Sequence, residues 1–208
     1  MPTEEVDPGC VKCVIVGDEG VGKTCMALSY ANREFPEETE STIFDTYAVD
    51  LTVDDEPWTL GMFDTAGQEP YESLRAFAYA QCEVFIICFS VVKPDSLENV
   101  ETVWMPEIKH YNKKRKPVIL VGTQTDLREA DHIPRDTIIS QKEAEKMAEL
   151  LGASCYLECS ALSRDGLQHI FNETLLSAID VRRKKKHNRL RVFVKRLSDT
   201  LKRKKTKG

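Results

Sequence analysis

The chain has 208 residues, 41% of them apolar and 30% charged, and a formal net charge of −5. This length predicts one globular domain with short appendages and argues against a large multidomain protein. The seven cysteines are an odd number, are scattered along the chain and have no histidine cluster beside them. That pattern argues against a disulfide framework and against a zinc site, and it favours the reducing cytoplasm.

The charge divides the chain into an acidic body and a basic tail. From Arg182 onward there are 14 lysines and arginines against one acidic residue, whereas residues 1–181 carry the other 15 basic and 33 acidic residues. We therefore expect a short N-terminal extension over residues 1–10, a globular domain over 11–181 and a basic tail over 182–208. The start of the chain lacks the features of a leader peptide, and the longest apolar run, residues 84–89, is too short to span a bilayer.

Six short apolar runs predict strands, and longer stretches between them predict helices. The expected strands are residues 11–16, 48–53, 58–63, 84–90, 118–122 and 155–159, and the expected helices are residues 24–31, 97–111, 141–151 and 167–181. Turn-forming residues between the second and third strands predict an antiparallel hairpin at the sheet edge. The alternation predicts an α/β fold with a six-stranded, mostly parallel sheet, one antiparallel edge strand and helices on both faces.

A phosphate-binding loop follows the first strand. Residues 17–24 read GDEGVGKT and fit G-x-x-x-x-G-K-[ST] between a strand and a helix, which is the context that the motif needs. Backbone N–H groups of such a loop surround phosphates, Lys23 reaches the β- and γ-phosphates, and the Thr24 hydroxyl binds Mg²⁺. A glycine-rich turn that only happens to precede a lysine is the alternative. The residues expected to contact the nucleotide here are Glu19, Gly20, Val21, Gly22, Lys23, Thr24 and Cys25.

The third expected strand ends at a second candidate site. Asp64, Gly67 and Gln68 belong to the sequence DTAGQE over residues 64–69. An aspartate at a strand end can hold Mg²⁺ directly or through water, Gly67 can offer its N–H to a γ-phosphate, and Gln68 can orient an attacking water. Taken alone, this segment is also compatible with an ordinary turn.

Two further strand-end loops carry residues suited to a purine base. Thr123, Gln124 and Asp126 follow the fifth strand, and Ser160, Ala161 and Leu162 follow the sixth. A carboxylate at Asp126 would accept hydrogen bonds from N1–H and the exocyclic amine of guanine, two donors that adenine does not present together. Each loop alone is a common turn, but their order favours a guanine nucleotide.

Over roughly residues 11–180 the chain resembles a small GTPase of the Ras superfamily, and most closely the Rho family. Beyond the loops above, the resemblance rests on TIFDTY at 42–47, CFS at 88–90, SLENV at 96–100, WMPE at 104–107 and YLECSAL at 156–162. It implies the small G-protein form of the P-loop NTPase fold and a switch that binds GTP or GDP with Mg²⁺. It also implies that Thr42 coordinates Mg²⁺ beside Thr24, and that Phe35 packs against the base.

The resemblance implies protein partners as well. Effector proteins are expected to contact the first switch, through Ile43, Phe44, Asp45 and Tyr47, and the second switch, from residue 67 to about residue 79. Exchange factors are expected partners, activating proteins are expected to act weakly, and no DNA binding is expected. Signalling in cytoskeletal or membrane-trafficking control is the role that the family implies.

Three positions depart from the Rho pattern. Glu19 stands where Ras and Rho proteins carry glycine, and its side chain should crowd Gln68 and an incoming arginine finger. Gln124 replaces the lysine of [N/T]-K-x-D, which favours faster exchange, and Thr39 replaces a tyrosine that folds over the phosphates. The T-Q-x-D form is similar to that of the atypical Wrch/Chp branch. We therefore predict a weak GTPase, with impaired hydrolysis and fast nucleotide exchange.

Other readings of the body remain open. If Glu19 points outward and Gln124 hydrogen-bonds adequately, the protein cycles in the ordinary way. The chain can also be a non-cycling nucleotide-binding scaffold, a pseudo-GTPase, although the retained phosphate, magnesium and water-orienting residues favour catalysis. A P-loop kinase is disfavoured by the guanine-site loops.

The tail combines positive charge with an apolar face. Leu190, Phe193, Val194, Leu197 and Leu201 are spaced for one side of a helix, and arginine and lysine occupy the remainder. This pattern predicts an interfacial helix that attaches the cytoplasmic protein peripherally to the anionic surface of the plasma membrane or endomembranes. A nuclear-localisation or RNA-binding patch is the alternative. Because no cysteine follows Cys159, the C-terminal lipid anchors of Rho relatives are not expected.

Overall fold

The computed structural model describes residues 9–37, 42–112 and 115–184. A six-stranded sheet in the order β2-β3-β1-β4-β5-β6 forms the centre of this described part. All neighbouring strands are parallel except β2 and β3, which pair antiparallel at one edge. The predicted α/β fold, its six strands and its edge hairpin are confirmed. The strands are β1 (Cys10–Gly17), β2 (Phe44–Val53), β3 (Glu56–Thr65), β4 (Val84–Ser90), β5 (Val118–Thr123) and β6 (Cys155–Glu158).

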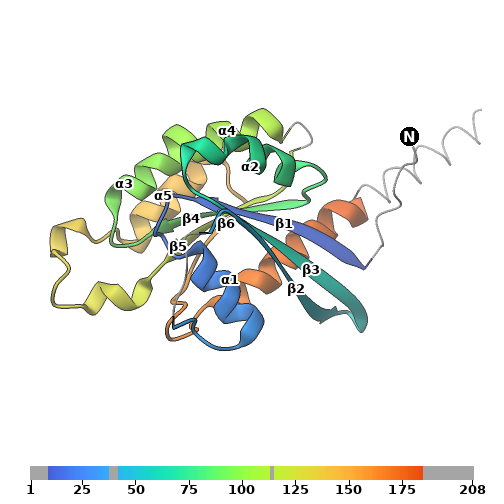
Figure 1. Cartoon of the computed structure of the whole chain (residues 1–208), viewed down its shortest axis with the longest axis horizontal. Helices are drawn as coiled ribbons and strands as arrows, with labels where there is room; N and C mark the ends of the chain where they lie inside the picture. The colour runs from blue at the N-terminus through green and yellow to red at the C-terminus, as the bar shows by residue number, and fades with distance from the viewer. Residues whose placement is uncertain (1–8, 38–41, 113–114, 185–208) are drawn as a thin grey trace, which may run out of the picture.

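Helices cover both faces of the sheet (Figure 1). One face carries α1 (Lys23–Asn32) and a helix over residues 167–184. The other face carries α2 (Glu72–Tyr79), α3 (Pro94–Asn99), α4 (Met105–Tyr111) and α5 (Gln141–Leu151). Among the described residues, three short 3₁₀ turns lie in the connections: η1 (Glu69–Tyr71), η3 (Thr125–Glu129) and η4 (Arg135–Thr137). None of the helices among the described residues is long and apolar enough to cross a bilayer.

The central strands supply apolar side chains to both helical layers. All seven residues of β4 are buried. Successive side chains of a strand point to opposite faces. Accordingly Val84, Ile86 and Cys88 join the cluster on the α1 side, while Phe85, Ile87 and Phe89 join the cluster on the α2–α5 side. One continuous apolar run therefore anchors two hydrophobic cores.

Two elements begin three or four residues before their predicted starts. Strand β2 begins at Phe44, four residues before the predicted start, because its pairing with β3 extends to Phe44 opposite Thr65. The helix predicted over residues 97–111 begins at Pro94 and contains a π-helical turn, η2 (Val100–Trp104), in which the Met105 N–H donates to the carbonyl of Val100. The turn precedes Pro106, which has no N–H to donate to a regular helix.

Helix α2 was not predicted. Its buried residues are Arg75, Ala78 and Tyr79, whereas Leu74 and Phe77 are exposed. A charged residue lies on the buried side and large apolar residues lie outside, and the eight-residue segment is too short for its apolar pattern to identify a helix.

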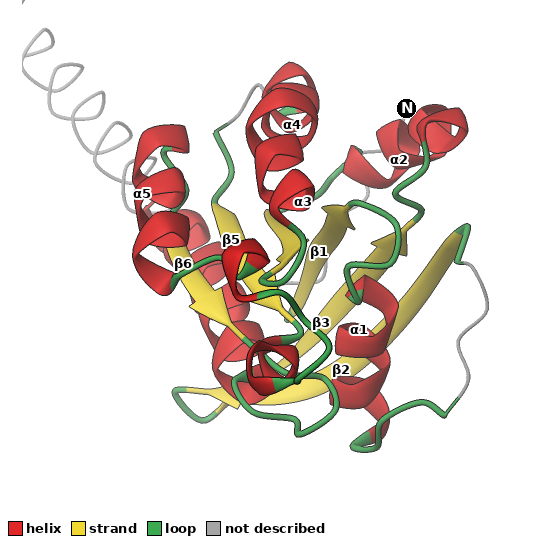
Figure 2. Cartoon of the chain, turned by 90° about the vertical axis from the view of Figure 1, so that its left-hand side faces the viewer, coloured by secondary structure: helices red, strands yellow, loops and turns green. Residues whose placement is uncertain are grey.

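The parallel topology gathers the candidate loops at one edge (Figure 2). In such sheets ligands bind beyond the carboxyl ends of the strands. The loops after β1, β3, β5 and β6 all start there and contain the residues singled out above. The predicted apolar face of the tail, Leu190 to Leu201, and the altered position Thr39 lie outside the described residues.

Candidate functional site

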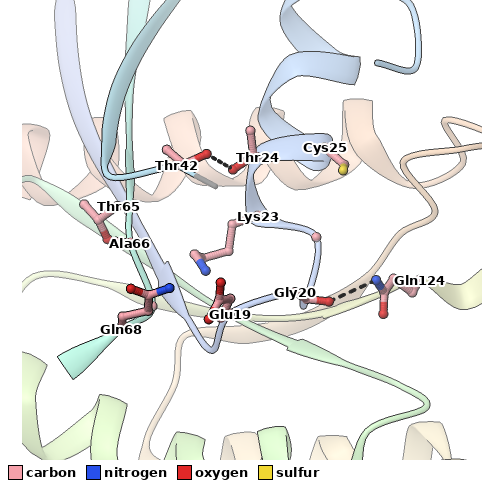
Figure 3. Close-up of a pocket in the computed structure, with 12 residues that line it drawn as sticks. Glu19, Gly20, Lys23, Thr24, Cys25, Thr42, Thr65, Ala66, Gln68 and Gln124 are labelled. Atoms are coloured by element: carbon pink, nitrogen blue, oxygen red, sulfur yellow. Dashed lines mark hydrogen bonds between the residues drawn. The ribbon is translucent and has the colours of Figure 1, made fainter. Parts of the chain in front are cut away.

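A cavity of about 420 Å³ lies at this edge of the sheet (Figure 3). Most of its lining consists of predicted site residues: Glu19, Gly20, Gly22, Lys23, Thr24, Cys25, Thr42, Gly67, Gln68 and Gln124. Thr65 and Ala66 complete the lining and were not among the predicted residues. Both belong to the DTAGQE sequence, between Asp64 and Gly67, so they could have been predicted from that motif.

The loop before α1 forms a cradle for an anion. Gly22 immediately precedes α1 with φ 88°, and Gly20 has φ 69°, a backbone region that glycine enters without steric cost. The side chain of Lys23 is buried, and its Nζ donates to the carbonyl of Asp18 at 2.7 Å. The N–H groups at the start of α1 together with this ammonium suit a phosphate chain.

Three oxygen-bearing side chains from three segments meet beside Lys23. Thr24 Oγ1 donates to Asp64 Oδ2 at 2.6 Å and lies 2.7 Å from Thr42 Oγ1. Asp64 is fully buried, and its Oδ1 has no partner among the described residues. Burial raises the pKa of Asp64 to about 6, although the hydrogen bond from Thr24 acts in the opposite direction. Hard oxygen ligands around an unpaired buried carboxylate oxygen fit Mg²⁺.

Glu19 lines the cavity beside the buried lysine. Its side chain lies next to Lys23, on the side of the cavity where Gln68 stands (Figure 3). Burial lowers the pKa of Lys23, whereas neighbouring acidic groups, Asp64 foremost and Glu19 among them, act to raise it. The carboxylate of Glu19 therefore contributes negative charge to the region that a polyphosphate would occupy.

The loop after β3 lies directly on the phosphate-binding loop. A Cβ atom on Gly67 would stand 2.5 Å from the carbonyl oxygen of Gly17 and 2.6 Å from the backbone nitrogen of Glu19. Only glycine fits this approach, since real Cβ contacts are longer. Thr65 Oγ1 donates to the carbonyl of Ile15 at 2.9 Å, and this bond fixes the end of β3 to β1.

The loops predicted to bind the base adjoin the cavity from the other side. Gln124 Nε2 donates to the carbonyl of Gly20 at 3.3 Å, while its Oε1 is buried with no partner in the described part. Thr123 is buried, and its hydroxyl lies within hydrogen-bonding distance of the carbonyl oxygens of Val21 and Phe89. The Thr125 N–H donates to the carbonyl of Cys159, so the loops after β5 and β6 are joined.

Several predicted residues lie outside the cavity lining: Phe35, Asp126, Ser160, Ala161 and Leu162. The carbonyl of Ala161 accepts from the Ser29 hydroxyl of α1 at 2.8 Å, and the hydroxyl of Ser160 accepts from the N–H of Ser163 at 3.0 Å. Leu162 is exposed and Phe35 is half-buried. Their roles at a base stay predictions.

The predicted effector residues straddle the start of β2. Ile43 is 51% exposed and Asp45 is exposed, whereas Phe44 packs edge-on against Phe63. Tyr47 is half-buried, and burial raises its pKa to about 12. Ile43 and Asp45 thus present side chains to solvent next to Thr42.

A sequence model of the Ras family matches residues 12–180, which include every loop of the cavity. The chain belongs to the Ras family. Ras-family small GTPases are switches that bind GTP or GDP with Mg²⁺, hydrolyse GTP, and bind effectors, exchange factors and activating proteins. The glycine cradle and the oxygens of Thr24, Thr42 and Asp64 fit this chemistry.

The variant Asp64→Asn tests the magnesium assignment, because asparagine removes the buried charge but keeps an acceptor for Thr24. Burial raises the pKa of Asp64 from 3.8 to about 6, so the stability contributed by the protonated carboxyl is lost as the pH rises through 6. At pH 7.5 with GDP and EDTA we therefore expect the variant to melt no lower than the parent. Added Mg²⁺ should raise the melting temperature of the parent only, as measured by differential scanning fluorimetry.

The matched control is Asp55→Asn, the same change in the exposed β2–β3 turn, where φ 61° suits asparagine. It should respond to Mg²⁺ like the parent. If Mg²⁺ stabilised Asp64→Asn as strongly as the parent, Asp64 would have no part in holding the cation.

Proposed function

We propose that this Ras-family protein is an atypical, Rho-like GTP/GDP switch with impaired hydrolysis and fast nucleotide exchange, closest in its motifs to the Wrch/Chp branch. The Rho-like segments quoted above support the branch. The position of Glu19 in the cavity lining, beside Lys23 and on the side of Gln68, is the observation that carries the biochemical part. The proposed organisation is an extension over residues 1–10, a G domain over 11–181 and a basic tail over 182–208.

The predicted site residues take defined parts in this proposal. Lys23 and the backbone from Gly20 to Lys23 hold the phosphates, and Gln68 orients the attacking water. Thr24 and Thr42 hold Mg²⁺, which neutralises charge on the β- and γ-phosphates when bound. Asp126 selects guanine. The short contacts among Thr24, Thr42 and Asp64 support the metal assignment, because an oxygen of Asp64 and the hydroxyl of Thr42 each lie within 2.7 Å of the Thr24 hydroxyl.

Impaired hydrolysis follows from volume and charge at Glu19. Gln68 must face the γ-phosphate to orient water, and an arginine finger from an activating protein must enter the same space. The arginine finger supplies a factor of ~10³–10⁵ in rate, so a side chain that excludes it removes most of the acceleration. The negative charge near the polyphosphate adds repulsion.

Restoring glycine should therefore restore hydrolysis. We expect Glu19→Gly to raise the single-turnover rate of GTP hydrolysis by about tenfold or more, equivalent to about 1.4 kcal/mol or more in activation free energy. Glu19→Gln is the matched control: it removes the charge and keeps the volume, so a rate close to that of the parent assigns the effect to crowding. Equal rates for parent and Glu19→Gly would refute impaired hydrolysis through Glu19.

Fast exchange follows from the weak contact of Gln124 with the phosphate-binding loop. Its bond to the Gly20 carbonyl is long, at 3.3 Å, and the donor is uncharged. Hydrogen bonds from charged donors contribute roughly 1.5–3 kcal/mol, against about 1 kcal/mol for neutral ones. The Oε1 of Gln124, which is buried with no partner among the described residues, adds a desolvation cost that a lysine would not carry.

The variant Gln124→Lys should slow nucleotide release. We expect the GDP dissociation rate to fall by about tenfold, the effect of about 1.4 kcal/mol, when release of a fluorescent GDP is followed by stopped flow. Gln124→Ala, which removes the contact altogether, should release GDP at least as fast as the parent. Slow release by the parent, unchanged in Gln124→Lys, would contradict fast exchange.

A non-cycling scaffold is the competing function. The nucleotide that co-purifies with the protein separates the two: GTP that exchanges rapidly supports the switch, stable GDP indicates ordinary cycling, and an empty site indicates the scaffold. Effector contact is proposed through the exposed Ile43 and Asp45 and the second switch, where Leu74 and Phe77 are exposed. Exchange factors are expected partners, and activating proteins should act weakly.

We also propose that the tail attaches the protein to anionic membrane. This proposal rests on the amino-acid sequence of the tail, which lies outside the described residues. Each basic residue near an anionic surface contributes ~1 kcal/mol to the free energy of membrane binding. In sedimentation with phosphatidylserine-containing vesicles, Phe193→Glu should lower the bound fraction several-fold. Asn188→Glu, which adds the same charge on the opposite side of the helix that the sequence predicts, should lower it less. Equal binding by both variants would contradict insertion of an apolar face and favour a purely basic patch.

A further inference from the structure

The phosphate-binding loop is held from outside by one helix. The carboxylate of Asp18 accepts from Asn99 Nδ2 and from Trp104 Nε1, each at 2.7 Å. The carbonyl of the same residue accepts from Lys23 Nζ at 2.7 Å. Asp18 therefore joins the phosphate-binding lysine to the helix that runs through α3, η2 and α4.

The second switch is held to the same helix by a buried guanidinium. Arg75, only 3% exposed, lies on α2. Its Nη1 donates to the carbonyls of Ala66, at 3.1 Å, and of Gln68, at 2.8 Å. Its Nε and Nη2 each donate to the carboxylate of Glu107 at 2.9 Å. The two carbonyls flank Gly67, the residue that touches the phosphate-binding loop.

The two attachments meet at Trp104. The guanidinium carbon of Arg75 lies 5.1 Å from the centre of the indole ring, whose N–H bonds Asp18. Trp104 and Glu107 are three residues apart and so share one side of the helix. Tyr79 also donates to Glu107. A continuous set of partly buried contacts thus connects Lys23, through Asp18, Trp104 and Arg75, with the backbone of Gln68.

Burial gives these contacts their weight. A charged donor fixes a carbonyl with roughly 1.5–3 kcal/mol, and removing one partner of a buried ion pair leaves the other uncompensated. With both carbonyls around Gly67 fixed, the direction in which the Gln68 side chain leaves the backbone is fixed as well. Gln68 lines the cavity in this arrangement.

We propose that Arg75, clamped by Glu107, is a positioning residue for GTP hydrolysis: it holds the backbone of Gln68 so that the side chain faces the cavity, and Trp104 couples this clamp to the phosphate-binding loop. The inference rests on the proposed GTP switch, since it concerns the geometry of its second switch. It assigns Arg75, Glu107 and Trp104 no contact with the nucleotide.

The first test compares hydrolysis with nucleotide release. Single-turnover hydrolysis of bound GTP is measured for Arg75→Gln, Glu107→Gln and the double variant, in the natural and the Glu19→Gly backgrounds. We expect each single variant to slow hydrolysis at least tenfold while GTP dissociation changes less than about threefold. The double variant should be no slower than the single ones, because the pair acts as a unit.

Glu83→Gln is the matched control, since it breaks another ion pair, with Arg182, remote from the cavity. It should leave hydrolysis unchanged even where it lowers the melting temperature. If Arg75→Gln does not fold, Arg75→Lys keeps the charge without the planar fork and should still slow hydrolysis. Hydrolysis unchanged in a folded Arg75 variant would overturn the inference alone; failure of the parent to bind GTP would overturn the proposed function and the inference together.

The second test is spectroscopic. The chain has two tryptophans, so Trp58→Phe leaves Trp104 as the only one, and it also removes a buried indole N–H without a partner in the described part. Emission of Trp104 should differ between the GDP state and a state with a non-hydrolysable GTP analogue. The difference should disappear in Arg75→Gln and persist in Glu83→Gln. Identical emission in both nucleotide states of the parent would overturn the coupling.

Discussion

The buried carboxylate of Asp64 is the constraint around which the loops of the site are arranged. Its oxygen accepts from Thr24, and the hydroxyl of Thr24 reaches Thr42, so two hydrogen bonds tie together the ends of three segments distant in sequence. A carboxylate removed from water is costly unless charges and donors surround it. Lys23 supplies part of that compensation. A ligand that completes it binds the folded state alone and thereby stabilises it.

The bounds of an element could be predicted from the sequence where local features alone determine them. Strand β4 and helix α5 have the predicted bounds, because β4 is an uninterrupted apolar run and α5 begins with the capping box of Ser140 and Glu143. Helix α2 was not predicted because one of its three buried residues is Arg75, whose hydrogen-bond partners are residues 66, 68 and 107. Because the partners of this charge are distant in sequence, the local pattern of apolar and charged residues does not show which side of the helix is buried.

The candidate site shows the same division. The motif around Lys23 and the strand-end position of Asp64 located the cavity, since both follow from local sequence and the edge at which parallel strands end. Asp18 gave no such signal. Its partners, Asn99 and Trp104, follow it by 81 and 86 residues, and only packing brings them together. The contacts that join loops to one another could not be read from periodicity or spacing.

The π-helical turn explains how a single carboxylate can gather both donors. Asn99 and Trp104 are five residues apart, and in a regular α-helix, at about 100° per residue, they would point about 140° away from each other. Hydrogen bonds of the i→i+5 type place residues five apart one above the other instead. The helix departs from regular α-helical geometry in the turn that contacts the phosphate-binding loop. This departure lets the side chains of Asn99 and Trp104 both donate hydrogen bonds to the carboxylate of Asp18.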